Sequence, residues 1–186
     1  IAGQHIKSLQ HRGSLIRESN EKEINRLEID KLSNDMYKLS MTAGEEIIDV
    51  IPQDYIIDGE QGVKQPVGML GSKIEANFHV IIGQTAAAKN ILKCVKRAGL
   101  EMVDLILEPI ASAESVLSDE EKEAGVVLVD IGGGTTDIAI FYDKIIRHTA
   151  VIPFGGDIIT EDIREGCTII KKHSEFSSEK MHFELI

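Results

Sequence analysis

Val126-Val-Leu-Val-Asp-Ile-Gly-Gly-Gly-Thr-Thr-Asp-Ile-Ala-Ile140 is the stretch of sequence that decides the fold. An apolar run reaches Asp130, three glycines follow, and a second apolar run begins after Asp137. Short apolar runs that are flanked by glycine fit strands better than helices. The stretch therefore predicts a buried strand, a tight turn and a returning strand.

The glycines at the turn, Gly132, Gly133 and Gly134, predict a place where a phosphate can approach the main chain. Glycine has no Cβ, so it adopts backbone angles that are closed to other residues and allows a ligand to come close. Successive N–H groups in such a turn form a concave site for an anion. A simple glycine hairpin between two core strands is the alternative interpretation.

Four polar residues frame this turn and complete the predicted site. Asp130, at the end of the first strand, is placed to hold a hydrated Mg²⁺, because its charge would repel a phosphate. Thr135 and Thr136 add hydroxyl donors, and Asp137 follows them directly. We therefore predict a site for a phosphate–metal pair, in which Asp130 contacts the metal through water.

The octapeptide Asp130-Ile-Gly-Gly-Gly-Thr-Thr-Asp137 resembles the second phosphate motif of the superfamily that contains actin, sugar kinases and heat-shock chaperone ATPases. The resemblance implies that Asp130 and residues 132–137 contact ATP and its Mg²⁺. The motif is typical of the superfamily but does not select one of its members.

Five stretches outside the motif resemble, in the same order, the FtsA family of bacterial cell-division proteins. They are Ile1–Ser8, Ile51–Gly59, Pro66–Gly71, His79–Gly83 and Phe154–Asp157. The resemblance implies an ATP-binding scaffold that tethers the FtsZ ring to the membrane and recruits later division proteins. It also implies a cytoplasmic location, on the inner face of the cell membrane at the division site.

The implied fold combines α+β and α/β parts: a small inserted subdomain, of the SHS2 type, followed by part of an actin-like, ribonuclease H-like domain. Residues 1–7 would end a strand of the first actin-like domain, and residues 8–83 would form the insert. Residues 84–123 would add a helix, a strand and a helix that cross over, and residues 124–186 would begin the second domain. In FtsA-like proteins the insert is a platform for self-association and for partners.

The pattern of residues within the insert agrees with one helix on a small antiparallel sheet. Ile1–Leu9 predicts a strand, with a turn at His11-Arg12-Gly13. Asn25 predicts a helix start, because Glu28 follows three residues later as in a capping box. Glu46–Asp58 predicts a strand in which Pro52 requires an edge or a bulge. Apolar residues then alternate from Ile74 to Ile82, which predicts a half-buried strand.

The segment between the insert and the glycine motif predicts a helix from Thr85 to Gly99, a strand at Met102–Leu107 and a charged loop at Ser118–Glu123. Glu108 and Pro109 predict another helix start, since proline suits the first turn. Beyond the motif, Ile145–Val151 predicts a third strand and Ile158–Glu165 a helix.

Three residues outside the motif are further candidates for the site. In the superfamily, a Glu-Pro-x-Ala stretch crosses between the two halves, which implies that Glu108 orients the attacking water or binds the hydration shell of the metal. An acid that merely suits the helix dipole is the alternative for Glu108. Gly155 and Gly156 are cofactor-binding candidates, because a glycine pair at a helix start brings N–H groups to an anion. A plain helix start is the alternative for this pair.

Composition limits the partners. The chain has 186 residues and a net charge of −11, which argues against a nucleic-acid partner or a general anionic-membrane surface. Cys94 and Cys167 form no CxxC pair, and the six histidines show no metal-ligand spacing. No apolar run approaches the ~20 residues of a membrane span. We expect membrane contact only through a C-terminal amphipathic helix outside this sequence.

The chain begins at Ile1, and we expect it to be an internal fragment of a longer protein. The first phosphate loop would precede Ile1, and the adenosine-contacting glycines would follow Ile186. Enzymatic activity would be at most slow ATP hydrolysis by the full protein, with the fragment inactive. The alternatives are a pilus-assembly-type actin-like ATPase and a phosphotransferase of the sugar-kinase or heat-shock ATPase superfamily. Residues 167–186 suggest no function.

Overall fold

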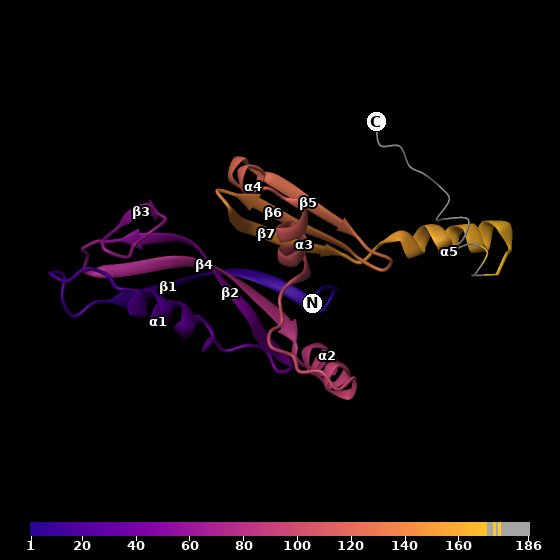
Figure 1. Ribbon diagram of the computed structural model, residues 1–186, viewed down its shortest axis with the longest axis horizontal. Helices are drawn as coiled ribbons and strands as arrows, with labels where there is room; N and C mark the ends of the chain where they lie inside the picture. The colour runs from indigo at the N-terminus through magenta and orange to yellow at the C-terminus, as the bar shows by residue number, and fades with distance from the viewer. Residues whose placement is uncertain (171–172, 174, 176–186) are drawn as a thin grey trace.

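The computed structural model describes residues 1–170, 173 and 175, and it contains two antiparallel sheets (Figure 1). The first sheet has the order β1-β4-β2-β3, with α1 on one of its faces. The second sheet has the order β5-β6-β7, which are Val126–Ile131, Thr136–Tyr142 and Ile145–Ile152. The elements of the first part are β1 (Ile6–Ile16), α1 (Arg26–Met36), β2 (Glu45–Ile57), β3 (Glu60–Val63) and β4 (Lys73–Gln84).

The predicted turn at residues 11–13 is wrong, because β1 runs without interruption from Ile6 to Ile16 and pairs with β4 along its whole length. A Cβ on Gly13 would lie 2.9 Å from Met36 Cε and 3.1 Å from Phe78 Cε2. Gly13 is therefore present because α1 packs tightly onto the strand, and it does not mark a turn.

The central strand β4 is covered on both faces, so its buried residues do not alternate as the sequence predicted. Phe78 faces the α1 side, whereas His79 and Ile81 face the second sheet, and all three are buried. The predicted bulge near Pro52 is confirmed, since the register between β2 and β4 shifts between Pro52 and Asp54.

The predicted start of α1 is confirmed. Asn25 Oδ1 accepts a hydrogen bond from Glu28 N at 3.0 Å, and Glu28 Oε2 accepts one from Asn25 N at 2.9 Å. This reciprocal capping satisfies two N–H groups at the beginning of the helix. The helix buries Ile29, Leu32 and Met36 against the sheet.

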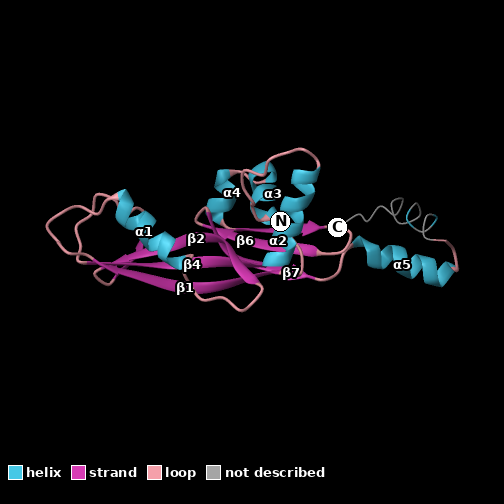
Figure 2. Cartoon of the chain, turned by 90° about the horizontal axis from the view of Figure 1, so that it is seen from below, coloured by secondary structure: helices cyan, strands magenta, loops and turns pink. Residues whose placement is uncertain are grey.

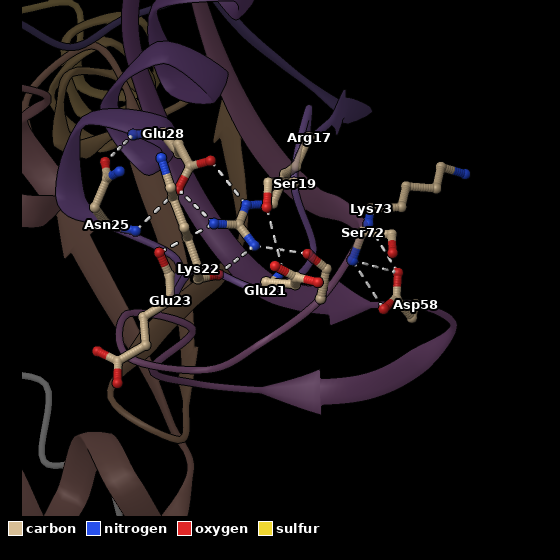
Figure 3. A network of polar contacts seen from close by, with 11 residues as sticks. Arg17, Ser19, Glu21, Lys22, Glu23, Asn25, Glu28, Asp58, Ser72 and Lys73 are labelled. Atoms are coloured by element: carbon tan, nitrogen blue, oxygen red, sulfur yellow. Dashed lines mark hydrogen bonds and ion pairs between the residues drawn. The ribbon is translucent and has the colours of Figure 1, made fainter.

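Arg17 connects α1 to two loops at the far end of the insert (Figure 3). Its guanidinium donates to both Glu28 oxygens and to the carbonyls of Lys22, Glu23 and Gly71. The hydrogen bond from Arg17 is the main reason why the pKa of Glu28 lies below its ordinary value. The buried guanidinium of Arg17 thus ties these two loops to α1, in addition to backbone hydrogen bonds such as that from Ile24 N to Met69 O.

The segment after the insert differs from its prediction in two elements. The helix α2 (Thr85–Arg97) ends before Gly99, whose φ of +76° suits the predicted helix stop. No strand forms at residues 101–107, where Val103 is 96% exposed. A strand requires a paired neighbour, and the only distant partner of this backbone among the described residues is Ile1, which bonds to Ile106 O and Glu108 N.

The predicted charged loop at Ser118–Glu123 is also wrong, because α4 (Asp119–Ala124) occupies it. Ser118 caps this helix together with Glu121, and the acids in its first turn suit the helix dipole. The remaining elements are α3 (Glu108–Val116), β5 (Val126–Ile131), β6 (Thr136–Tyr142), β7 (Ile145–Ile152) and α5 (Gly156–Cys167). The last helix projects away from both sheets (Figure 1, Figure 2).

Polar contacts join β7 to the face of the first sheet that α1 leaves free. Gln53 Nε2 donates to Ile146 O at 2.7 Å, and His79 Nε2 lies 3.2 Å from Thr149 Oγ1. Gln10 Nε2 lies 3.0 Å from His79 Nδ1. Burial lowers the pKa of His79, and the charge of His148 lowers it further, so a neutral imidazole is favoured. We call this set of contacts between β7 and the first sheet the joint.

Candidate functional site

The triglycine lies at the end of the β5–β6 hairpin, as the sequence predicted. The predicted burial of the first strand is wrong, because one face of β5 is exposed at Val127, Val129 and Ile131. The two strands pair in register from Val126 with Phe141 to Ile131 with Thr136. A hydrogen bond of 2.9 Å from Gly132 N to Thr135 O closes the turn. Residues 132–134 are exposed, so the turn is open to a ligand.

Three consecutive N–H groups in this turn are free to bind an anion. The N–H groups of Gly133, Gly134 and Thr135 make no hydrogen bond to another group of the described residues. A Cβ on Gly134 would meet no atom within 4 Å, so the space beside this residue is open. Successive free amides of this kind form an anion-binding concavity.

Two carboxylates face each other across the strands just before the turn. Asp130 pairs directly with Asp137 in the register of β5 and β6, so both side chains lie on the same face of the sheet. Directly opposed residues have Cβ atoms about 5 Å apart, and like charges at this separation are unfavourable unless a cation lies near. This arrangement suits a hydrated cation better than a phosphate.

Both threonine hydroxyls donate hydrogen bonds inside the protein. Thr135 Oγ1 donates to Asp137 Oδ2 at 3.1 Å, and Thr136 Oγ1 donates to the carbonyl of Phe154 at 2.8 Å. The sequence predicted these hydroxyls as donors to a phosphate. In this structure they shape the turn, and the free donors at the turn are backbone amides.

The helix α5 begins directly against the glycine turn. Gly156 N donates to Gly132 O at 2.9 Å, and Asp157 N donates to Gly133 O at 2.8 Å. A Cβ on Gly155 would lie 2.4 Å from both of these carbonyl oxygens, so no larger residue fits there. The glycine pair lies next to the turn as predicted, but the N–H group of Gly156 is already used.

Sequence reasoning singled out neither Ser112 nor Asp157 as a site residue. Ser112 Oγ donates to Asp130 Oδ2 at 3.0 Å and so orients this carboxylate. The carboxyl group of Asp157 lies beside the turn, since a Cβ on Gly133 would be 3.3 Å from its Oδ1. Asp157 ends the stretch Phe154–Asp157, and Ser112 lies in the helix that begins at Glu108. The contacts of both residues become visible only in the fold.

Glu108 lies on the same helix face as Ser112, because the two residues are four positions apart in α3. Its side chain is exposed at the first turn of this helix. The structure thus brings Glu108 to the side of α3 that meets Asp130.

The residues present fit a Mg²⁺–phosphate group on two observations: the open row of free amides and the opposed carboxylates. In the described part of the chain, no cluster of three or more histidine, cysteine or acidic side chains is suited to a directly ligated metal. The Asp130–Asp137 pair therefore suits a metal that keeps most of its water. Residues 1–170, 173 and 175 include no helix long and apolar enough to span a membrane.

Comparisons with known proteins match both halves of the chain. The family described as "SHS2 domain inserted in FTSA" matches residues 3–82, and "Cell division protein FtsA" matches residues 127–181. The cell division protein FtsA of Pseudomonas aeruginosa is 49% identical over 163 residues, covering 88% of this chain and 39% of that protein. FtsA of Bacillus subtilis is 36% identical over 175 residues, covering 94% of this chain and 40% of that protein.

A solved structure described as a PilM-PilN type IV pilus biogenesis complex shows the same fold. It has a TM-score of 0.61 at 15% identity and covers 93% of this chain and 47% of that chain. The predicted fold class, a small α+β insert followed by part of an actin-like domain, is confirmed. The chain spans about two-fifths of the length of the curated relatives it matches. The matches to the insert and to the glycine-turn half together show that the chain belongs to the FtsA family of bacterial cell-division proteins.

Proposed function

We propose that this chain supplies one phosphate-binding edge of the ATP site of an FtsA-type division scaffold, together with its interaction insert. The observation that carries the proposal is the exposed turn whose amides at Gly133, Gly134 and Thr135 have no partner among the described residues. In an ordinary turn of this kind the two central amides are free, but the fourth N–H bonds to the first carbonyl. Here Gly132 O accepts from Gly156 N, so the amide of Thr135 is free as well, beside two opposed carboxylates.

Each residue of the site has a proposed role. The three amides bind phosphate oxygens, and the pair Asp130 and Asp137 holds the water shell of Mg²⁺. Ser112 keeps the Asp130 carboxylate in place through its hydrogen bond. Bound Mg²⁺ would neutralise phosphate charge. Glu108, on the same helix face as Ser112, would orient the water for a slow hydrolysis in the full protein.

The scaffold role would follow from the insert and from parts of the protein outside this sequence. The insert would mediate self-association and recruit later division proteins, and another subdomain would bind FtsZ. A C-terminal amphipathic helix would attach the protein to the inner face of the membrane at the division site. Family membership supports these roles, because the curated relatives are cell division proteins.

The phosphate role is tested by a matched pair of glycine substitutions in a chimera, in which this chain replaces the corresponding segment of the Pseudomonas aeruginosa relative. Gly134→Ala adds a methyl group in open space at the turn, so the thermal unfolding midpoint should stay unchanged. The same methyl group would obstruct a bound phosphate, and calorimetry should show Mg·ATP affinity reduced by about tenfold or more.

Gly155→Ala is the matched variant at the helix start. Its Cβ would meet two carbonyl oxygens of the turn at 2.4 Å, so both the unfolding midpoint and Mg·ATP affinity should fall. Unchanged Mg·ATP affinity in the Gly134→Ala chimera would contradict the proposed phosphate site. The isolated chain should bind Mg·ATP more weakly than the micromolar range, because it leaves the phosphates largely in water, where electrostatic attraction is weak.

A further inference from the structure

A polar groove lies where the two sheets meet, away from the glycine turn. It has a volume of about 480 Å³, and its lining includes Arg12, Asn77 and Asp54 from the first sheet and Arg147 from β7. Arg12 and Asn77 are directly opposed residues of β1 and β4. The groove therefore occupies the part of the sheet face that β7 does not cover.

The donors of Arg12 and Asn77 are incompletely used. Arg12 Nε donates to Asn77 Oδ1 at 3.0 Å, which fixes the guanidinium beside the amide. The terminal nitrogens of Arg12 and the Nδ2 group of Asn77 bond to nothing else in the part of the chain that the structure describes. A guanidinium has two parallel N–H groups that match a carboxylate or a phosphate, so this pair has unused capacity for an oxyanion.

Arg147 places a second cation beside this pair. Its NH1 group is 3.0 Å from Asp54 Oδ2, and its Nε donates to Tyr142 O at 3.3 Å. Asp54, together with Asp143 at 3.8 Å from the other terminal nitrogen, balances the charge of Arg147, so the unpaired positive charge in the groove is that of Arg12. A positive groove in a chain of net charge −11 is a local exception, and it attracts anions that the rest of the surface repels.

We propose that this groove binds a small oxyanionic ligand, of the carboxylate or phosphate class, through Arg12 and Asn77, with Arg147 as the second cation. Because Arg12 lies on β1 and Arg147 lies on β7, a bound oxyanion would contact both sheets. The ligand would therefore hold the insert against the sheet that carries the glycine turn.

The test is an NMR titration of the isotopically labelled chain with inorganic phosphate and, in a separate arm, with succinate. We expect saturable shifts in the Arg12 side-chain N–H signal and in the backbone amides of the groove, separate from any shifts at residues 132–135. The arm with the higher affinity identifies the class of ligand. Added salt should weaken the binding, because the charges are partly exposed.

Four variants sharpen this test. Arg12→Met should weaken binding by about tenfold or more. Arg12→Lys keeps the charge but loses the two parallel N–H groups of the guanidinium, and it should weaken binding less. Asp54→Asn removes the negative charge nearest to Arg147 and leaves only Asp143 beside it, so binding should tighten. Lys89→Met, on α2 outside the groove, removes the same charge as Arg12→Met and should leave binding unchanged. Shifts that fail to saturate in both arms, or that Arg12→Met does not affect, would overturn the proposal.

Discussion

The insert and the sheet that carries the glycine turn differ in how completely they are buried. Residues along β4 in the insert are enclosed, and α1 covers the sheet through Leu32 and Met36. In the second sheet, the face away from α3 leaves Val127, Val129 and Ile131 exposed by 56%, 49% and 69%. The insert holds its own core, whereas the second sheet is stabilised from one side only.

The insert therefore contributes most of the buried core, whereas the second sheet carries the candidate ligand-binding groups. The groups that suit a phosphate and a metal lie at the end of the less buried sheet, where the backbone of the turn is open. Regions that bind ligands often come from the less stable part of a fold, because free donors and open space are incompatible with full packing. The well-packed insert sheet is the surface against which β7 packs.

The largest expected effect is in the insert. Phe78→Ala removes a fully buried ring between β4 and α1, and it should lower the free energy of unfolding by about 3–5 kcal/mol. Urea unfolding followed by circular dichroism measures this change. Val103→Ala, at an exposed position, is the control and should change stability by less than about 0.5 kcal/mol. A loss below about 1 kcal/mol for Phe78→Ala would mean that the insert core is not closed.

The second prediction concerns the joint between the two regions. The pKa of His79 is lowered in the folded state, chiefly by burial and also by His148, so the unfolded chain binds its proton more readily. The stabilising effect of neutral His79 is present above the unfolded pKa of about 6.5, and it is lost as the pH falls toward the folded pKa. Stability should therefore decrease as the pH falls below about 7.5, by about 1.4 kcal/mol for each unit of pKa lowering.

Unfolding curves at several pH values, for the unsubstituted chain and for His79→Gln, measure this contribution. The His79→Gln chain should lose the part of the pH dependence that belongs to the joint. His11→Gln, which changes a histidine that makes no hydrogen bond to β7, should retain it. An identical pH dependence in the His79→Gln and unsubstituted chains would exclude His79 as its source.

The smallest effect is expected on the open face of the second sheet. Val129→Thr keeps a β-branched side chain at a half-exposed strand position, so the free energy of unfolding should change by less than about 0.5 kcal/mol. Thermal unfolding is sufficient to measure this. A loss above about 1.5 kcal/mol would show that another surface covers this face in solution, and light scattering would then reveal self-association.

The features that local sequence could predict are those that depend on neighbouring residues. The cap at Asn25 and Glu28, the bulge near Pro52 and the strands on both sides of the glycine turn all follow from short patterns, and all are confirmed. The turn predicted at Gly13 is wrong because the helix that requires the small size of this residue begins more than ten residues later.

The errors between residues 101 and 124 also have physical causes. The apolar run at 102–107 has the composition of a strand but no sheet neighbour to pair with among the described residues. Ser118 and the acids after it are signals of a helix start, but a run of charges is equally typical of an exposed loop. At the site, the glycine turn was visible in the sequence, whereas the contacts of Ser112 and Asp157 depend on how distant segments meet.

The close contact at Gly155 couples the glycine turn to the orientation of α5. Two main-chain carbonyls of the turn are fastened to the first amides of α5, and the oxygens leave no room for a methyl group between them. A peptide plane that rotates to meet an anion must either break these fastenings or tilt the helix. The direction of the α5 axis therefore depends on the conformation of the glycine turn.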